Sequence, residues 1–274
     1  MVEHLNGGMS ASRNSNIALG SRLNHVLDVK RVIALEQAIA ADGTSLSSLM
    51  ERAGCALADE VRARLPRPAC VAVLAGSGNN GGDGWVCARA LAEAGWPVTL
   101  VSPMEADEIA AEPARSAALE AKARAKQLDL PLSLLIAPSP EELAEQLSGA
   151  HVVVDAILGT GFSGMQVREP YATWIELANA RCFPTDLEPS RGHAAEADAG
   201  GKAQGAAIMI AADAPSGLSA QTGEAALPCI RADVTVTMLV LKPGLLAPEA
   251  ARMTGRVKLA PLVDDVDRFI DVIA

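Results

Sequence analysis

The sequence predicts an α/β fold in which a doubly wound, mostly parallel sheet lies between two layers of helices. Three observations support this prediction. Short apolar runs of strand type alternate with longer runs of helical period along most of the 274 residues, and no internal repeat is visible. Half of the residues are apolar, which is enough for a sizeable core. Aromatic residues are scarce, so this core must consist of Ala, Val, Leu and Ile, as in parallel strands covered by helices.

Two helices are expected before the first strand. Asp28 is suited to cap the first helix, whose apolar residues recur at helical spacing until Gly43. Ser48 and Glu51 form the pattern of a capping box, so the second helix is expected to begin there or further back at Thr44. The residues expected to face the core are Val32, Leu35, Ile39, Leu49, Ala53, Ala56 and Leu57.

Six strands and one edge strand are expected, each an apolar run bounded by turn residues. They are Cys70–Ala75, Val98–Ser102, Leu132–Ile136, Val152–Asp155, Ala207–Ala212, Val234–Leu241 and Val257–Leu259. The helices expected between them are Val86–Ala94, Pro113–Gln127, Pro140–Leu147 and Tyr171–Ala180. The pattern of residues 263–274 is ambiguous and fits a helix.

The chain is expected to form one domain over residues 25–274. Residues 1–24 are polar and without period, which is typical of a flexible leader. Residues 182–206 are rich in Gly, Ala, Pro and charge and also lack a period. We therefore expect an insertion there that is mobile.

The most informative stretch runs from Gly76 to Gly84, where nine residues contain five glycines, two asparagines and an aspartate. Glycine loses much backbone entropy in a helix or strand, so a sharp turn between a strand and a helix is expected. Bare N–H groups and the positive end of the helix would face a ligand there. A structural turn is the plain alternative, but the polar side chains of Asn79, Asn80 and Asp83 exceed what a turn needs.

Two further loops carry polar residues at strand ends. Asp155 ends the fourth strand and precedes Gly159–Gly164, while Asp213 and Ser216 follow the fifth strand. The usual strand order 3-2-1-4-5 places strands one, four and five side by side. Ligands of such sheets bind beyond the carboxyl ends of the strands, so the three loops should line one crevice.

A carboxylate such as Asp155 at the end of an apolar strand is costly unless it is paired, hydrogen-bonded or bound to a cation. Asp155 is therefore a candidate for acid–base chemistry or cation ligation, with a loop cap as the plain alternative, and Asp213 is a second candidate. The amide of Asn80, the carboxylate of Asp155 and the hydroxyl of Ser216 would offer oxygen ligands with a single negative charge. This set suits a weakly held hard cation better than zinc.

Several other functions are disfavoured. No Lys-Ser/Thr pair follows the glycines, so the loop is not a P-loop. A dehydrogenase fingerprint needs an acid at the end of the second strand, but Ser102 stands there and the nearest acid is Glu105. Lys242 is interpreted as a solvated charge at a strand end, and none of the four histidines is placed for catalysis.

The net charge of −10, without a basic run or an aromatic platform, argues against nucleic acid or an anionic membrane as a partner. The five cysteines form no C-x-x-C pair, so we expect a reduced compartment rather than a metal cluster or a disulfide framework. The polar N-terminal region does not resemble a signal peptide, and no apolar run reaches membrane-spanning length. A cytoplasmic protein is expected.

Five segments of the sequence are Leu49–Gly54, Gly76–Gly84, Val154–Gly161, Asp213–Gly217 and Lys242–Gly244. In this order, over about residues 28–260, they together resemble the NAD(P)HX epimerase family, also called the YjeF N-terminal domain family. The resemblance implies a three-layer, Rossmann-like fold, an isomerase acting on NADHX and NADPHX, a bound potassium ion (K+) and a homodimer. Two departures from the family pattern are Ala214, where Ile is common, and the length of residues 182–206.

The resemblance also assigns roles to residues. The residues implied to bind the substrate are Asn79, Asn80, Gly81, Gly82, Asp83, Gly159, Thr160, Gly161, Phe162, Ser163, Gly164, Met165 and Asp213. Those implied to hold potassium are Asn80, Asp155 and Ser216. The dehydratase domain that often follows in bacterial relatives is not in this sequence, so we expect that activity on a separate chain.

The carbon that is epimerised carries a hydroxyl and is bonded to a ring nitrogen, so it is a hemiaminal. Loss and return of hydroxide through an iminium-type intermediate would invert it, and a group that gives and recovers a proton would accelerate this. Asp155 is the first candidate for that group and Asp213 the second. A non-catalytic binding module of the same fold is the alternative function, and an ordinary NAD-dependent oxidoreductase is a third.

Overall fold

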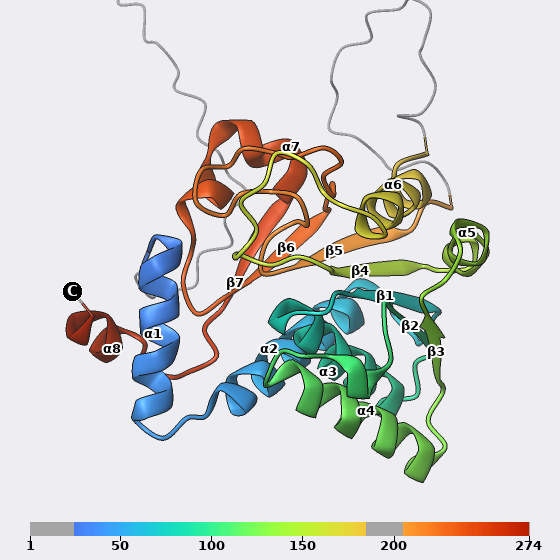
Figure 1. Cartoon of the computed structure of the whole chain (residues 1–274), viewed down its shortest axis with the longest axis horizontal. Coiled ribbons are helices and arrows are strands. Elements are labelled where there is room, and N and C mark those ends of the chain that lie inside the picture. The colour runs from blue at the N-terminus through green and yellow to red at the C-terminus, as the bar shows by residue number, and fades with distance from the viewer. Residues whose placement is uncertain (1–24, 185–204, 274) are drawn as a thin grey trace, which may run out of the picture.

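A seven-stranded sheet forms the centre of the computed structural model, which describes residues 25–184 and 205–273 (Figure 1). The strands are β1 (Val71–Ala75), β2 (Val98–Ser102), β3 (Leu132–Ile136), β4 (Val152–Ala156), β5 (Ile208–Ala212), β6 (Val234–Met238) and β7 (Arg256–Ala260). Their order is β3-β2-β1-β4-β5-β6-β7, and every neighbouring pair is parallel. The predicted α/β class and strand order are confirmed.

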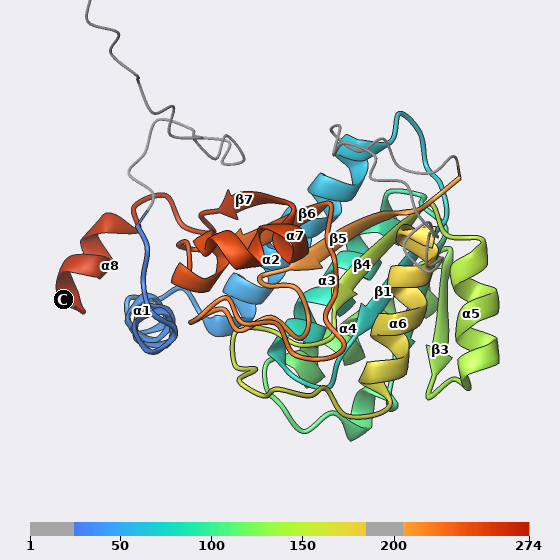
Figure 2. The same ribbon diagram turned by 90° about the horizontal axis from the view of Figure 1, so that it is seen from above.

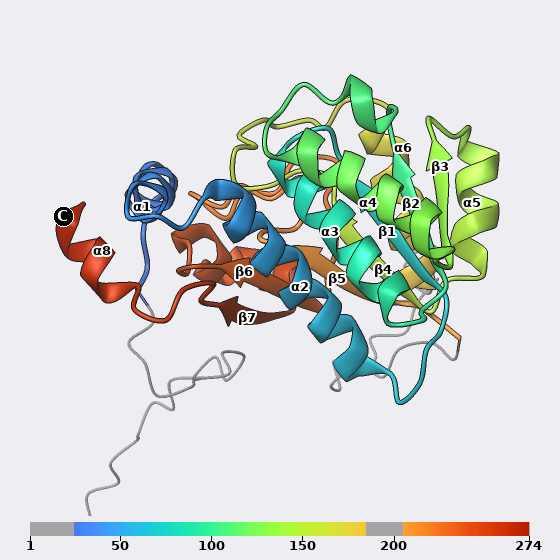
Figure 3. The ribbon, with the colours of Figure 1, turned by 90° about the horizontal axis from the view of Figure 1, so that it is seen from below.

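Helices cover both faces of this sheet and form the two outer layers. The helices are α1 (Val29–Ala41), α2 (Leu46–Arg64), α3 (Asn79–Glu93), α4 (Ala114–Leu128), α5 (Pro140–Ser148), α6 (Tyr171–Cys182), α7 (Ala251–Thr254) and α8 (Asp267–Val272). Three single turns of 3-10 helix are η1 (Ala106–Glu108), η3 (Pro243–Leu246) and η4 (Pro248–Ala250). Figure 3 shows α2, α3 and α4 side by side on one face, and α5 and α6 contact each other on the opposite face.

Two apolar clusters fill the spaces between the sheet and its helices. Val73 packs with Leu57 and Trp85 on the face of α2 and α3, whereas Leu74 packs with Trp174 on the face of α5 and α6. Neighbouring residues point to opposite faces because side chains alternate along a strand. Burial on both faces accounts for the continuous apolar runs by which the strands were predicted.

The first helix stands apart from the three layers. Figures 1 and 2 show α1 beyond the carboxyl ends of the central strands and next to α8. Asp28 caps it by accepting the N–H of Arg31 at 2.9 Å, as predicted. Its buried residues Leu35 and Ile39 pack against Leu239, which follows β6. The helix is therefore placed where it can form a wall of a site at this edge of the sheet.

The predicted boundaries of α2 and β6 are wrong. Ser45 caps α2, and its hydroxyl accepts the N–H of Ser48 at 3.1 Å, so Ser48 lies in the first turn and the alternative start near Thr44 is the better one. β6 ends at Met238 because Leu239 has a φ of 61° and turns the chain out of the sheet.

The predicted flexible leader at 1–24 and residues 185–204 of the predicted mobile insertion lie outside the described residues. Cys182 is the last residue of α6, so the insertion begins later than predicted. Within the two described ranges, none of the helices combines the length and the apolar character needed to span a bilayer.

Candidate functional site

The glycine-rich segment opens α3 at Asn79, well before the predicted start at Val86. Gly78, in an extended conformation, is the N-cap. Glycine suits the first turns of this helix because the backbones approach closely: a Cβ on Gly81 would lie 1.9 Å from the carbonyl oxygen of Gly76. The predicted sharp turn between strand and helix is present, but it ends at Gly78 instead of extending to Gly84. The N–H groups of the first helical turn lie at the cleft described next, where they suit an anion.

A cleft of about 570 Å³ lies at the carboxyl edge of the sheet, where the strand order reverses between β1 and β4. The loops after β1, β4 and β5 line it together, as expected, and α1 and α6 contribute further residues. The predicted site residues that line the cleft are Asn79, Asn80, Asp83, Gly159, Thr160, Gly161, Phe162 and Asp213.

The other predicted site residues lie outside the cleft lining. Asp155 and Ser216 are fully buried. The carboxylate of Asp155 accepts the N–H of Ile157, and the hydroxyl of Ser216 accepts the N–H of Leu158; Ile157 and Leu158 line the cleft. The remaining ones are Gly81 and Gly82, buried in α3, and Ser163, Gly164 and Met165, exposed further along the loop after β4.

Asp155 and Ser216 form a compact hydrogen-bonded unit between the ends of β4 and β5. Oδ1 of Asp155 accepts the hydroxyl of Ser216 at 2.5 Å, and Oδ2 accepts the Ser216 N–H at 2.8 Å. The Ser216 hydroxyl in turn accepts the N–H of Leu158 at 2.8 Å. Burial raises the pKa of Asp155 to about 6, while the hydrogen bonds from Ser216 and Ile157 act in the opposite direction.

The side-chain amide of Asn80 is buried, and neither its oxygen nor its nitrogen has a hydrogen-bond partner among the described residues. It lies against the loop after β4, since a Cβ on Gly159 would be 3.4 Å from Oδ1 of Asn80. Buried polar atoms without partners are a feature of ligand positions. Asn80, Asp155 and Ser216 offer oxygen atoms and a single carboxylate, which fits a hard cation. No cluster of three His, Cys, Asp or Glu residues that could hold a metal occurs in the described ranges.

Lys242 is not the solvated charge that we predicted. Its side chain is 1% exposed, and Nζ donates to Oδ1 of Asp213 at 2.5 Å, to the carbonyl of Met238 at 2.9 Å and to the hydroxyl of Thr237 at 3.0 Å. The turn at Leu239 explains this position, because it folds the chain back over the last residues of β6. Asp213 is thus held in an ion pair at the wall of the cleft.

Two further carboxyl groups, Glu36 of α1 and Asp83 of α3, lie near Asp213. All three line both the cleft and an adjoining hollow of about 110 Å³. Burial raises the pKa of Asp83 well above its ordinary value, and the charges of Asp213 and Glu36 raise it further, whereas Lys242 lowers it. Burial and the charge of Asp213 also raise the pKa of Glu36. The carboxyl groups of Glu36 and Asp83 therefore hold a proton more tightly than ordinary carboxyl groups do.

Sequence reasoning missed three residues that line or support the cleft: Glu36, Tyr171 and Lys242. Glu36 could have been found, because it lies four residues after Val32 on the inward stripe of α1. The hydroxyl of Tyr171 accepts the N–H of Ser77 at 3.1 Å and so braces the entry to α3. No sequence pattern connects two residues 94 positions apart.

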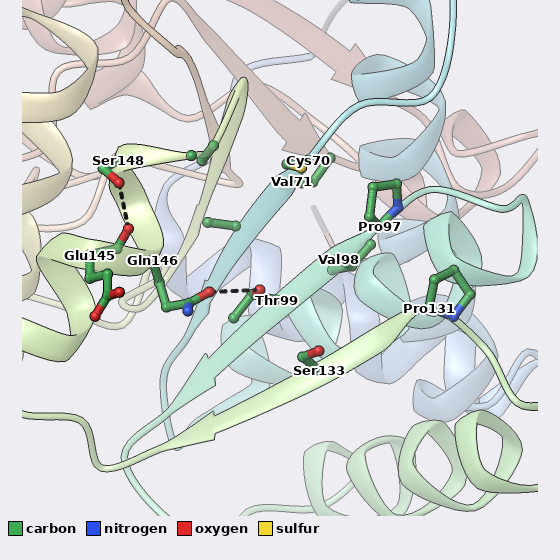
Figure 4. A pocket seen from close by; sticks show the side chains of 13 residues that line it. Cys70, Val71, Pro97, Val98, Thr99, Pro131, Ser133, Glu145, Gln146 and Ser148 are labelled. Carbon is green, nitrogen blue, oxygen red and sulfur yellow. Dashed lines mark hydrogen bonds between the residues drawn. The ribbon is translucent and has the colours of Figure 1, made fainter.

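A second cavity, of about 510 Å³, lies at the opposite edge of the sheet, near the amino ends of β1, β2 and β3 (Figure 4). Thr99 and Gln146 line it and form a hydrogen bond of 3.2 Å. Cys70 is exposed there. Because open α/β sheets bind ligands at the carboxyl edge, the cleft at that edge is the candidate functional site.

The doubly wound parallel sheet with a cleft at its switch point defines a Rossmann-like α/β protein. The chain belongs to the family described as YjeF-related protein N-terminus, which matches residues 46–244. The yeast protein ynu0 has a similar fold, with a TM-score of 0.66 at 21% identity over 90% of this chain and 93% of that chain. The helix that supplies Glu36 lies outside the matched range.

The curated relatives are named as enzymes that act on NAD(P)H-hydrate. NAD(P)H-hydrate epimerase of Cenarchaeum symbiosum is 34% identical over 84% of this chain and 92% of its own length. The epimerase of Pirellula staleyi is 33% identical over 82% and 86%. The bifunctional NAD(P)H-hydrate repair enzyme Nnr of Pyrobaculum aerophilum is 36% identical over 78% of this chain and 37% of its own length. This chain therefore spans about a third of the length of such bifunctional relatives.

Proposed function

We propose that this chain is an NAD(P)H-hydrate epimerase, an isomerase that interconverts the R and S forms of NADHX and NADPHX. Two relatives of similar length that are 33% and 34% identical bear this name. The observation that carries the proposal is the cleft itself, in which the loops after β1, β4 and β5 meet beside the N-terminus of α3. Such a cleft suits a nucleotide with a diphosphate.

The substrate would lie between the first turn of α3 and the loop after β4. The diphosphate suits the N–H groups of Asn79–Gly81, because they lack partners within the helix and carry its positive end. Gly159–Met165 would bound the opposite side, and Asp213 would accept a hydroxyl group of the substrate. Of these residues, Asn79, Asn80, Gly159, Thr160, Gly161, Phe162 and Asp213 line the cleft, which supports the proposal.

Asn80, Asp155 and Ser216 would hold the potassium ion. The partnerless amide of Asn80 and the buried oxygen atoms of Asp155 and Ser216 support this assignment. A potassium ion bound there would supply positive charge close to the anionic part of the substrate. Asn80 lines the cleft, whereas the other two residues would hold the ion from behind its wall.

The proton that assists loss of the hydroxyl has three candidate carriers. Asp155 is fully buried and bonded to Ser216, so its geometry favours a role as a cation ligand. Asp213 lines the cleft and accepts a hydrogen bond from Lys242, so its geometry favours a role as a hydrogen-bond acceptor. Asp83 lines the same cleft with a raised pKa and is suited to donate a proton and recover it.

In this mechanism the protonated group gives its proton to the hydroxyl oxygen as the C–O bond breaks, and water leaves. The lone pair of the ring nitrogen forms the iminium bond, which makes the carbon planar. Water then adds to either face and returns a proton to the carboxylate, so atoms and charge balance. Rebinding on the opposite face gives the other epimer.

Incubation of NADHX in water enriched in heavy oxygen tests the proposal. The protein should accelerate both inversion and uptake of the heavy isotope into the hydroxyl, measured by mass spectrometry, above the rates of a blank without protein. Equal rates with and without protein would refute the proposed function. Accelerated inversion without isotope uptake would refute the mechanism, provided that released water exchanges with the solvent.

The homodimer and the cytoplasmic location are also proposals. The first follows from the family resemblance, and the second from the cysteine pattern. Light scattering of the eluting protein in size-exclusion chromatography would give the oligomeric state directly. A mass equal to one chain of 28.2 kDa would contradict the dimer.

A further inference from the structure

Asp213 turns one carboxylate oxygen toward the protein and leaves the other for a ligand. Oδ1 accepts hydrogen bonds from Lys242 Nζ at 2.5 Å, from the N–H of Met238 at 3.1 Å and from the hydroxyl of Thr237 at 3.2 Å. Oδ2 accepts none from the part of the chain that the structure describes. Because Asp213 lines the cleft and its side chain is 14% exposed, Oδ2 is the acceptor open to a ligand.

The ammonium group of Lys242 uses all of its hydrogen-bond donors in this arrangement. An ammonium group has three donors, and each has its own acceptor: Asp213, Thr237 and the carbonyl of Met238. Thr237 accepts from Lys242 and donates to Asp213, so the two contacts reinforce each other. A buried lysine is costly to the fold even when it is paired, and an apolar residue of similar size would avoid that cost. This cost indicates that the Lys242–Asp213 pair serves the function of the protein rather than its stability.

Lys242 also offsets negative charge at the cleft. Glu36, Asp83 and Asp213 line it, while no lysine or arginine lines the cleft or the adjoining hollow among the described residues. Several uncompensated carboxylates would repel the diphosphate of the proposed substrate. Lys242 neutralises one of them from behind the wall without occupying space that the substrate needs.

We propose that Lys242 is a positioning residue, which fixes Asp213 so that Oδ2 accepts a hydrogen bond from a hydroxyl group of the bound nucleotide. Asp213 touches the substrate, and Lys242 affects substrate binding by holding Asp213 in place. This inference rests on the proposed function, because it takes the ligand to be a hydroxyl-bearing nucleotide. It predicts that the effects of replacing the two residues are not independent.

The test compares Lys242→Met, Asp213→Asn and the double variant in steady-state epimerisation of NADHX. Each single variant should raise KM by about tenfold to a hundredfold, as expected for loss of a hydrogen bond to a charged group. The double variant should be no worse than Asp213→Asn alone. Lys242→Arg, which retains the charge, should recover part of the affinity.

Lys258→Met is the matched control. Lys258 lies on the neighbouring strand β7 and pairs with the buried Glu60 at 2.5 Å, away from the cleft. The Lys258→Met variant should have a lower free energy of unfolding than the wild type and an unchanged KM. The proposal is overturned if Lys242→Met has the same KM as Lys258→Met, or if the double variant multiplies the two single effects.

A second comparison covers the case in which Lys242→Met does not fold because Asp213 is left buried without its partner. The double variant has neither charge and should fold, and its KM should equal that of Asp213→Asn. A tenfold difference between these two variants would overturn the proposal.

Titration with NADPH, followed by its fluorescence, separates failure of the inference from failure of the proposed function. A wild-type protein that epimerises, with a KM that does not depend on Lys242, overturns only the inference. A wild-type protein that binds NADPH with an affinity that depends on Lys242, but does not epimerise NADHX, overturns only the function. Absence of both binding and epimerisation overturns both.

Discussion

Ser216 donates its hydroxyl to Asp155 across 2.5 Å, and this bond joins the ends of two adjacent strands, β4 and β5. Both side chains are fully buried, and the backbone N–H of Ser216 also bonds to the same carboxylate. The two loops that follow these strands are thereby fixed relative to each other. The side-chain amide of Asn80, which has no hydrogen-bond partner among the described residues, lies against the loop after β4.

Potassium should stabilise the wild-type protein, because an ion that binds only the folded state raises its free energy of unfolding. Replacing choline chloride by potassium chloride at constant ionic strength should raise Tm of the wild type and of Asp129→Asn, an exposed control at the end of α4. Asp155→Asn should abolish this rise. The same rise in Asp155→Asn would refute the cation site, and a deep fall in kcat with the rise retained would indicate acid–base catalysis by Asp155.

Stability should depend on pH through Asp83. Its pKa in the folded protein lies above the ordinary value of 3.8, so the folded state holds the proton more tightly than the unfolded chain. This contribution is fully present below about pH 4 and is lost as pH rises, by at most about 1.4 kcal/mol per pH unit. The free energy of unfolding of the wild type minus that of Asp83→Asn should therefore fall as the pH rises above about pH 4. A difference that does not change with pH would contradict the raised pKa.

Two glycines of the same loop should respond differently to alanine. A Cβ on Gly76 would lie 1.9 Å from the carbonyl oxygen of Ile157, whereas a Cβ on Gly78 would meet nothing within 4 Å. Gly76→Ala should be severely destabilised, and Gly78→Ala should stay within about 0.5 kcal/mol of the wild type in chemical unfolding. Similar losses in both variants would contradict the close approach of the two loops.

Tyr171→Phe should weaken both the fold and the site. The hydroxyl of Tyr171 bonds to the N–H of Ser77 at 3.1 Å and to its hydroxyl at 3.2 Å, directly before the N-cap of α3. Its removal should lower the free energy of unfolding by about 1 kcal/mol and raise KM for NADHX. Ser77→Ala, which retains the bond to the N–H group, should have the smaller effect. Unchanged stability and KM in Tyr171→Phe would show that the brace is dispensable.

The positions of the strands were predictable because parallel strands that are buried on both faces consist of continuous runs of apolar residues. Their order was predictable because it is the usual one for alternating strands and helices. The same order predicted that the loops carrying Asn80, Asp155 and Asp213 would converge. The start of α3 was not predictable from helix propensity. Gly81 and Gly84 are needed because the helix packs closely against the ends of β1 and β4, and not because the chain turns there. Tertiary packing overrides helix propensity there.

Burial and pairing of charged residues were harder to predict. Lys242 follows an apolar strand in the same way as many solvated lysines, and only the positive φ of Leu239 brings it back to Asp213. A single residue in an unusual backbone conformation leaves no periodic signal. The full burial of Asp155 also depends on a partner 61 positions away, Ser216. Long-range pairs of this kind are fixed by topology and not by local pattern.

The most direct test of the account is the initial rate at which pure R-form NADHX converts to the S form, with the two epimers separated by chromatography. After subtraction of the spontaneous rate, the account predicts a rate that is proportional to wild-type protein concentration, requires potassium and falls strongly in Asp213→Asn. A rate that is the same with protein and with buffer alone would contradict it.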